Sequence, residues 1–230
     1  MITKNHFKYY CSDQILQWFS SFDARRYKIC NRIARRHVEL CRNILKGHIW
    51  RDAEVENNGA YITGVLFKGL IEFIQLADLT RDQKWHLNNK RTEKVWTLMW
   101  NCIDRFDFSS STLNYEGFTR IRNKLEELRK IFIDYFGPGF YSSPEILIRN
   151  ESCGICKKDI RACPHMPGRL YNGTICHSIP QHIELKSVSL VTLPEDPRCR
   201  IWPWNMNTDK SFHVVVMTLF HIDDWLTDVK

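Results

Sequence analysis

The sequence lacks the long apolar runs that a membrane-spanning helix requires. Its longest apolar stretches, Tyr61–Phe67 and Phe212–Phe220, fall far short of roughly 20 residues. The first residues have neither the apolar segment nor the small-residue cleavage site of a secretory signal. Internal repeats and low-complexity tracts are also missing. We therefore expect a protein that has no contact with a membrane and resides in the cytoplasm.

The composition is typical of a folded soluble protein and excludes a disordered or fibrous chain. Apolar residues make up 43% and charged residues 26% of the 230 residues. Such a length provides one large domain or two small ones, and either buries a core without needing disulfides.

Hydrophobic periodicity divides the chain into two halves. From Ser12 to Tyr135, apolar residues recur every three or four positions, which predicts a helical bundle with Asp13, Asp23 and Thr80 as helix caps. From Ser142 onward, glycine, proline and short β-type runs predict a small, partly sheet domain. The expected fold class is α+β, with a helical bundle over 1–140, a β-rich domain over 141–230 and a boundary near Gly137–Ser143. The expected helices are 12–20, 24–47, 60–78, 81–106 and 115–136, and the expected strands are 145–148, 183–193 and 212–220.

Eight of the nine cysteines fall into two groups. Those in the first half are scattered among apolar positions, and we interpret them as small buried side chains. In the second half, Cys153, Cys156, Cys163 and Cys176 crowd into 24 residues. A disulfide framework is excluded by the reducing compartment and the odd count. A redox Cys-x-x-Cys would be expected to follow a strand in a βαβ unit, which the pattern does not contain.

The spacing Cys153-x2-Cys156, followed by Cys163-x-His165, predicts a metal site. A Cys-x2-Cys turn directs two thiolates at one centre, Gly154 permits a tight bend, and the second pair completes four ligands. Three sulfurs and one imidazole favour Zn²⁺ in a closed, structural site. Cys176 or His177 remains an alternative for one of the four ligands. The second half is thus expected to be zinc-stabilised.

Residues 136–201 resemble a known kind of protein module through four sequence motifs. These are FGPGFYSSPEI, C-x2-C-x6-C-x-H, HMPGRLYNG and ELKSVSLVTLPEDPRCRI. Together they resemble a zinc-bearing module of uncharacterised phage-related bacterial proteins. The last motif is similar to the serine segment of tailed-phage prohead maturation proteases, a similarity that makes Ser189 the candidate nucleophile. Such a nucleophile requires a histidine beside it. The alternative is that Ser187 and Ser189 form the polar face of a half-exposed strand.

One expected helix, over 24–47, is strongly basic. Between Arg25 and Arg51 the sequence has nine basic residues and one acidic residue, Glu39, whereas the whole chain carries a net charge of +7. Such a surface attracts a phosphate backbone. The alternative is a solvated face neutralised by carboxylates from elsewhere, such as Glu54 or Glu126. The candidate nucleic-acid-binding residues are Arg25, Arg32, Arg35, Arg36, Arg42 and Lys46.

The same helix contains two arginine–histidine spacings, Arg32-x4-His37 and Arg42-Asn43-x4-His48. Both are similar to the signature of HEPN ribonucleases, whose helical domains dimerise around an RNA-cleaving site. That similarity implies that His48 acts as acid and base and that Arg42 holds the scissile phosphate. The alternative for His37 is a hydrogen-bonded residue of the core.

The sequence thus favours an intracellular zinc-binding interaction protein in a phage-related or antiphage-defence context. Its expected partners are nucleic acid, bound by the basic helix, or a phage or other protein. Trp202-Pro203-Trp204 is either an anchor for such a protein or the lid of the small domain. The competing class is an enzyme, a HEPN-like ribonuclease before a serine protease. The oligomeric state and the partner's identity stay open.

Overall fold

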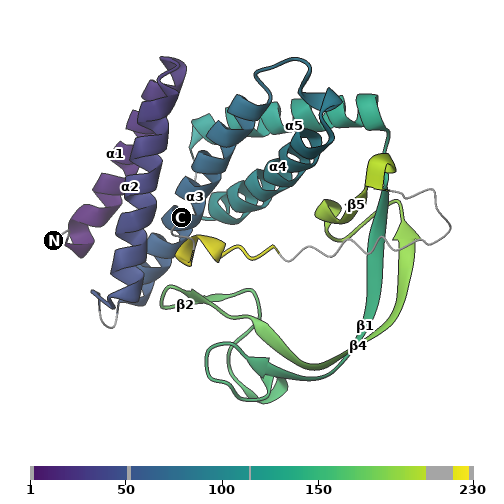
Figure 1. Ribbon diagram of the computed structural model, residues 1–230. Coiled ribbons are helices and arrows are strands. Elements are labelled where there is room, and N and C mark those ends of the chain that lie inside the picture. Colours follow the sequence, from purple (N-terminus) through teal and green to yellow (C-terminus); the bar gives the residue numbers. More distant parts are fainter. Residues whose placement is uncertain (1–2, 51–52, 114, 206–219, 228–230) are drawn as a thin grey trace. The chain divides into compact units, whose positions relative to one another are not determined.

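The computed structural model describes residues 3–50, 53–113, 115–205 and 220–227. Within them, five α-helices precede a small sheet region, which confirms the α+β class (Figure 1). The expected strand 212–220 lies almost wholly outside the described residues. The helices are α1 (Lys4–Asp23), α2 (Tyr27–Lys46), α3 (Glu54–Leu79), α4 (Asn89–Ser110) and α5 (Glu116–Phe136), and the strands are β1 (Phe140–Cys153), β2 (Leu170–Tyr171), β3 (Thr174–Ile175), β4 (Ser178–Val191) and β5 (Arg200–Ile201).

The helix boundaries correct several expectations. Residues 81–88 form a turn that contains the short 3-10 helix η1 (Trp85–Leu87), so α4 begins only after Asn88, whose side chain accepts a hydrogen bond from the Arg91 N–H. Two of the three expected caps were wrong, because Asp13 lies within α1 and Asp23 is its last residue, whereas Thr80 caps the C-terminal end of α3. Carboxylate and hydroxyl groups also occur inside helices, so these residue types alone do not fix a helix start.

The first compact unit comprises residues 1–126, 170–174 and 221–230. In it α1 packs on α2, α2 on α3, and α3 on α4 (Figure 1). α2 buries Cys30, Ala34, Val38 and Cys41, spaced by three and four residues, as its sequence predicts. The scattered cysteines of this half are all buried and free, which confirms their interpretation as core residues.

Among the described helices, α3 is long and apolar enough to cross a membrane by length and composition. Within its most apolar window, 78% is buried inside the protein. Leu66, Phe67 and Leu70 are fully inaccessible to solvent. This burial is typical of the central helix of a soluble domain.

The second compact unit comprises residues 127–169 and 175–220. Its main feature is a long antiparallel ribbon of β1 and β4, in which Tyr141 pairs with Val191 at one end and Cys153 with Ser178 at the other (Figure 1). β5 pairs briefly with β1 beside Tyr141. Nearly every residue of β4 is exposed. The ribbon therefore has no apolar face packed along its length.

The compact units do not follow a single linear boundary. The division falls within α5, and the hairpin turn Asn172-Gly173 belongs to the first unit. Both turn residues have positive φ, 46° and 76°, as a two-residue hairpin turn requires. Asn172 Oδ1 accepts a hydrogen bond from Asn57, and Gly173 N–H donates one to Asn58, both on α3. The sequence Asn-Gly is the signal that predicts this turn.

Candidate functional site

Four potential metal ligands meet where β1 ends. Cys153 is the last residue of β1, and hydrogen bonds between its main chain and Lys157 N–H and Lys158 C=O close a turn after it. Lys157 takes the positive φ, 62°, that the turn needs. Gly154 instead accommodates the main chain of His177, since a Cβ there would lie 3.0 Å from the His177 carbonyl oxygen. The turn brings Cys156 beside Cys153, and the segment after the 3-10 helix η2 (Ile160–Ala162) brings Cys163 and His165 to the same place.

The four ligand atoms fit a zinc ion. Those of Cys153, Cys156, Cys163 and His165 all lie within 4.8 Å of one another, and Cys153 Sγ is 3.6 Å from His165 Nδ1. Ligands about 2.0–2.3 Å from one tetrahedral Zn²⁺ are separated by about 3.6–3.8 Å. The set of three sulfurs and one imidazole is the one that the spacing predicted. Four protein ligands on one tetrahedral ion would leave no coordination position open, which is typical of structural zinc sites.

Backbone amides prepare one sulfur of this cluster for a metal. Burial disfavours the Cys153 thiolate, but the N–H groups of Cys156 and Ile155 point at its Sγ and lower the pKa of Cys153 to about 6. Burial and the adjacent Cys153 sulfur raise the pKa of Cys176 to about 11. A thiolate is thus present near neutral pH, and a bound divalent ion would favour deprotonation of the other ligands.

Cys176 is a fifth donor at the edge of the cluster. Its Sγ lies 3.7 Å from that of Cys153, and both cysteines are fully buried. Its main chain is fixed by hydrogen bonds from Cys176 N–H to Arg169 C=O and from Gly168 N–H to Cys176 C=O. The substitution of Cys176 for one of the four ligands therefore stays open. His177 contributes a carbonyl, which accepts a hydrogen bond from Gly154 N–H.

Ser189, the candidate nucleophile, lies on the exposed strand β4. The ribbon register places it opposite Ser143, and the cross-strand partners of residues 187–191 are Tyr141, Ser142, Ser143, Pro144 and Glu145. These partners contain no histidine that could act as its base. The neighbouring Ser187 donates a hydrogen bond to Glu145. Ser187 and Ser189 are exposed, but Val188 and Leu190 are 39% and 67% exposed as well, so both faces of the strand are exposed and it is not the half-exposed strand of the alternative.

Arg42 is turned into the protein, away from the surface of α2. Its guanidinium donates from Nε and Nη2 to the Trp225 carbonyl oxygen, at 3.2 and 2.5 Å, and from Nη1 to Glu39. His48 lies on the exposed turn after α2 with φ at 45°. The Arg42 side chain therefore takes part in the packing of the protein and is not part of the exposed basic face. His37 is fully buried against Phe67, Phe7 and Tyr10, as expected for a core histidine.

The other basic side chains of α2 and its preceding turn are exposed. Arg35 donates to Asn31 on the same helix, and Arg25, Arg32, Arg36 and Lys46 form no ion pair with any described carboxylate. The expected neutralising acids do not reach them within the described chain. The basic face is thus a patch of uncompensated positive charge.

Positive charge is concentrated at a hollow beside the α1–α2 turn. Arg25 has a left-handed backbone, with φ at 56°, and lines a cavity of about 450 Å³. Asp23 in this wall is already paired with Arg120, and Arg81 is paired with Asp78. A second hollow, of about 590 Å³, shares Arg25, Tyr27 and Arg81 and adds Arg26 and Lys28. The residues lining the first hollow are Phe22, Asp23, Arg25, Tyr27, Arg81, Arg120 and Lys124.

The tryptophan pair of the second unit takes part in its packing. Trp202 is buried, stacks on Trp204 with ring centroids 5.0 Å apart, and meets the edge of Phe136 at 5.6 Å. The Arg200 guanidinium covers Trp202 at 4.8 Å and donates to the Phe136 and Gly137 carbonyls. For Trp202, the lid interpretation is the one that the geometry supports.

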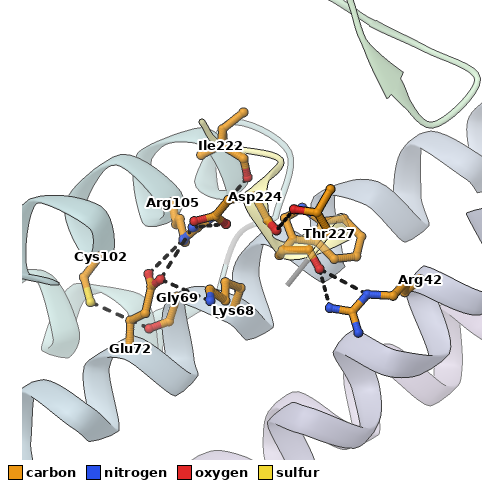
Figure 2. A network of polar contacts seen from close by, with 10 residues as sticks. Arg42, Lys68, Gly69, Glu72, Cys102, Arg105, Ile222, Asp224 and Thr227 are labelled. Carbon is orange, nitrogen blue, oxygen red and sulfur yellow. Dashed lines mark hydrogen bonds and ion pairs between the residues drawn. The ribbon is translucent and has the colours of Figure 1, made fainter. Parts of the chain in front are cut away.

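Sequence reasoning missed a buried ionic network in the helical unit. Arg105 of α4, fully inaccessible to solvent, binds Glu72 of α3 at 2.8 Å and Asp224 at 2.5 Å (Figure 2). Lys68 approaches the same Glu72 at 3.6 Å. The partners are separated by 33 and 119 residues. No local spacing signals such a contact.

No family model matches the chain, and neither a curated protein nor a solved structure matches it. The resemblances to phage-related zinc modules, prohead proteases and HEPN ribonucleases therefore stay predictions.

Proposed function

We propose that this protein is a zinc-stabilised interaction protein that binds nucleic acid through the basic face of α2 and the hollow at the α1–α2 turn. The observation that carries the proposal is the group of exposed cations there, Arg25, Arg32 and Arg36 among them, that have no partner among the carboxylates of the described residues. Phosphates from a polyanion would supply the missing negative charge.

The hollow offers more than charge. Phe22 and Tyr27 lie in its wall beside Arg25 and Lys124. Cationic side chains that follow a backbone, combined with aromatic rings on which bases stack, are the chemistry of single-strand binding. A single-stranded RNA or DNA therefore suits this surface better than a compact small anion. The expected binding tolerates many sequences, since charge and stacking carry little base information.

The metal has a structural part in this proposal. Cys153, Cys156, Cys163 and His165 would hold Zn²⁺ and fix the end of the β1–β4 ribbon, and the ion would supply folding free energy but no open coordination position. The phage-related or antiphage-defence context rests on the resemblance of residues 136–201. In that context the ribbon is the surface we assign to a protein partner. The inward direction of Arg42 weighs against the HEPN-like alternative.

Fluorescence anisotropy with a short labelled single-stranded RNA tests the nucleic-acid proposal. We expect binding that weakens steeply between about 50 and 200 mM salt. Replacing Arg25 and Arg36 with serine should weaken binding by about tenfold and reduce the salt dependence. Arg122→Ser is the matched control, because Arg122 is exposed but already paired with Asp107. Equal affinities for the double variant and the control would refute the proposal, as would salt-independent binding.

A further inference from the structure

The described end of the chain, residues 222–227, is seated among α2, α3 and α4 of the first unit. Trp225 is fully buried, and its indole lies against Gly64 of α3, where a Cβ would come within 2.3 Å of the ring. Tyr61, one turn earlier on α3, meets the indole edge-on at 5.6 Å. Gly64 therefore provides the space that one large aromatic ring occupies.

Two buried arginines hold the main chain of this segment from different helices. Arg42 of α2 donates two hydrogen bonds to the Trp225 carbonyl oxygen, at 3.2 and 2.5 Å. Arg105 of α4 donates to the Ile222 carbonyl oxygen at 2.8 Å and pairs with the Asp224 carboxylate (Figure 2). Charge-assisted bonds to main-chain carbonyls are strong and depend on direction. The segment is thus recognised by its backbone, its acid and its tryptophan together.

The segment contributes charge to the ion pairs of the surrounding helices. Arg105 and Lys68 share Glu72, and Asp224 brings the second carboxylate to this pair of cations. Arg42 also pairs with Glu39, whose side chain is 55% exposed. Removal of the segment would take a carboxylate from the buried Arg105 and a carbonyl oxygen from the buried Arg42, and loss of a partner of a buried charge is costly.

From these contacts we infer that residues 222–227 are an intramolecular peptide ligand and that α2, α3 and α4 form its docking groove. The groove selects an acidic segment with a tryptophan one residue after the aspartate that pairs with Arg105. Its occupant is the chain's own end. A partner protein that carries such a segment would have to displace this end. The inference does not depend on nucleic-acid binding.

Gly64 gives a sharp test, because a methyl group there closes the space for Trp225 and at the same time favours the helix. Gly59→Ala is the matched control in the same helix, since a Cβ at Gly59 meets nothing within 4 Å. A protease recognition sequence is inserted between Asn205 and Phe220 of the full zinc-loaded chain. After cleavage is verified on a denaturing gel, native gel filtration shows whether the released end stays with the body.

We expect the cleaved end to co-elute with the body in the parent protein and in Gly59→Ala. In Gly64→Ala and in Trp225→Ala its affinity should fall at least tenfold, which competition with a synthetic peptide of residues 220–230 would measure. Dissociation from a parent body whose helices stay folded by circular dichroism overturns the inference. Equal retention in Gly64→Ala and Gly59→Ala also overturns it.

Discussion

The two compact units differ in how their polar side chains are placed and partnered. The helical unit buries Arg105 and Glu72 among aromatic and aliphatic side chains and pairs Arg105 with Glu72 and with the partly exposed Asp224. The ribbon unit has few buried side chains along β1 and β4, and its polar cluster of cysteines and histidine lies at one end. The first arrangement relies on packing, whereas the second gathers side chains that could hold a metal ion.

The exposure of the ribbon explains how a bound ion would stabilise this unit. Ile183, Leu185 and Leu190 are more than half exposed on β4, at 57%, 53% and 67%. A two-stranded ribbon without a packed face is marginal in water. Its stability therefore depends on its ends, one at the metal ligands and the other at Trp202, Phe136 and Arg200.

The largest expected effect is metal removal, and it should separate the two units. Chelation removes a contribution that for structural zinc is on the order of 10 kcal/mol of binding free energy. We expect amides of residues 153–165 to lose protection in hydrogen exchange, while those of α3 keep theirs. Cys153→Ser should reproduce this pattern and lower the zinc content. Equal loss of protection in both regions would mean that the units are not independent in stability.

Truncation of Trp225 should produce the next largest effect, in the other unit. Trp225→Ala removes a fully buried ring and leaves a cavity at Gly64, so we expect a loss of about 3–5 kcal/mol in unfolding free energy. Urea denaturation followed by circular dichroism measures this loss. The control is Trp204→Ala in the ribbon unit, which should leave the helical transition unchanged. A loss below about 1 kcal/mol for Trp225→Ala would contradict the packing described.

The fourth metal ligand can be settled by a pair of variants. His165→Ala should weaken zinc binding by more than about 100-fold if the imidazole coordinates the ion, and Cys176→Ser should cost about tenfold or less as a neighbour of the ligands. Competition with a zinc-sensitive dye gives both affinities, and the charge-transfer bands of the Co²⁺ form count the sulfurs. The reverse ranking would assign four sulfurs to the metal.

Acid should destabilise the helical unit through His37. Burial lowers the pKa of His37 to about 3, below its ordinary 6.5, so the folded protein keeps it neutral. The unfolded chain binds the proton more readily, and stability present above pH 6.5 should fall by about 1.4 kcal/mol per pH unit between pH 6.5 and 3. Urea midpoints across this range should fall less steeply for His37→Phe. Metal release is common to both proteins and leaves this difference unaffected.

The sequence predicted those features that depend on residues close together in the chain. The cluster of Cys153, Cys156, Cys163 and His165 lies within 13 residues, and α2 follows a regular apolar period, so both were accessible from the sequence. Contacts between Arg42 and Trp225 join residues 183 positions apart and leave no periodic signal. The position of Arg42 in α2 predicted an exposed basic residue. Its contact with the distant Trp225 carbonyl oxygen, which places it inside the protein, is known only from the tertiary structure.

Strand lengths were underestimated for a related reason. β1 covers Phe140–Cys153, whereas the apolar run predicted only residues 145–148. Strand recognition relies on alternation between a buried and an exposed face, and the ribbon has no buried face over most of its length. β1 extends to the candidate metal ligand Cys153 because it pairs with β4 over this length, and not because its residues are buried.

The smallest expected effect tests whether the ribbon surface is free in solution. Leu190 is 67% exposed, so Leu190→Ser should change the unfolding free energy by less than about 0.5 kcal/mol. The matched variant Leu70→Ser in α3 replaces a fully buried leucine and should cost several kcal/mol. A cost above about 1 kcal/mol at Leu190 would show that the ribbon is covered in solution. Concentration dependence of that cost would then identify the cover as a second copy of the chain, because only association between copies makes stability depend on protein concentration.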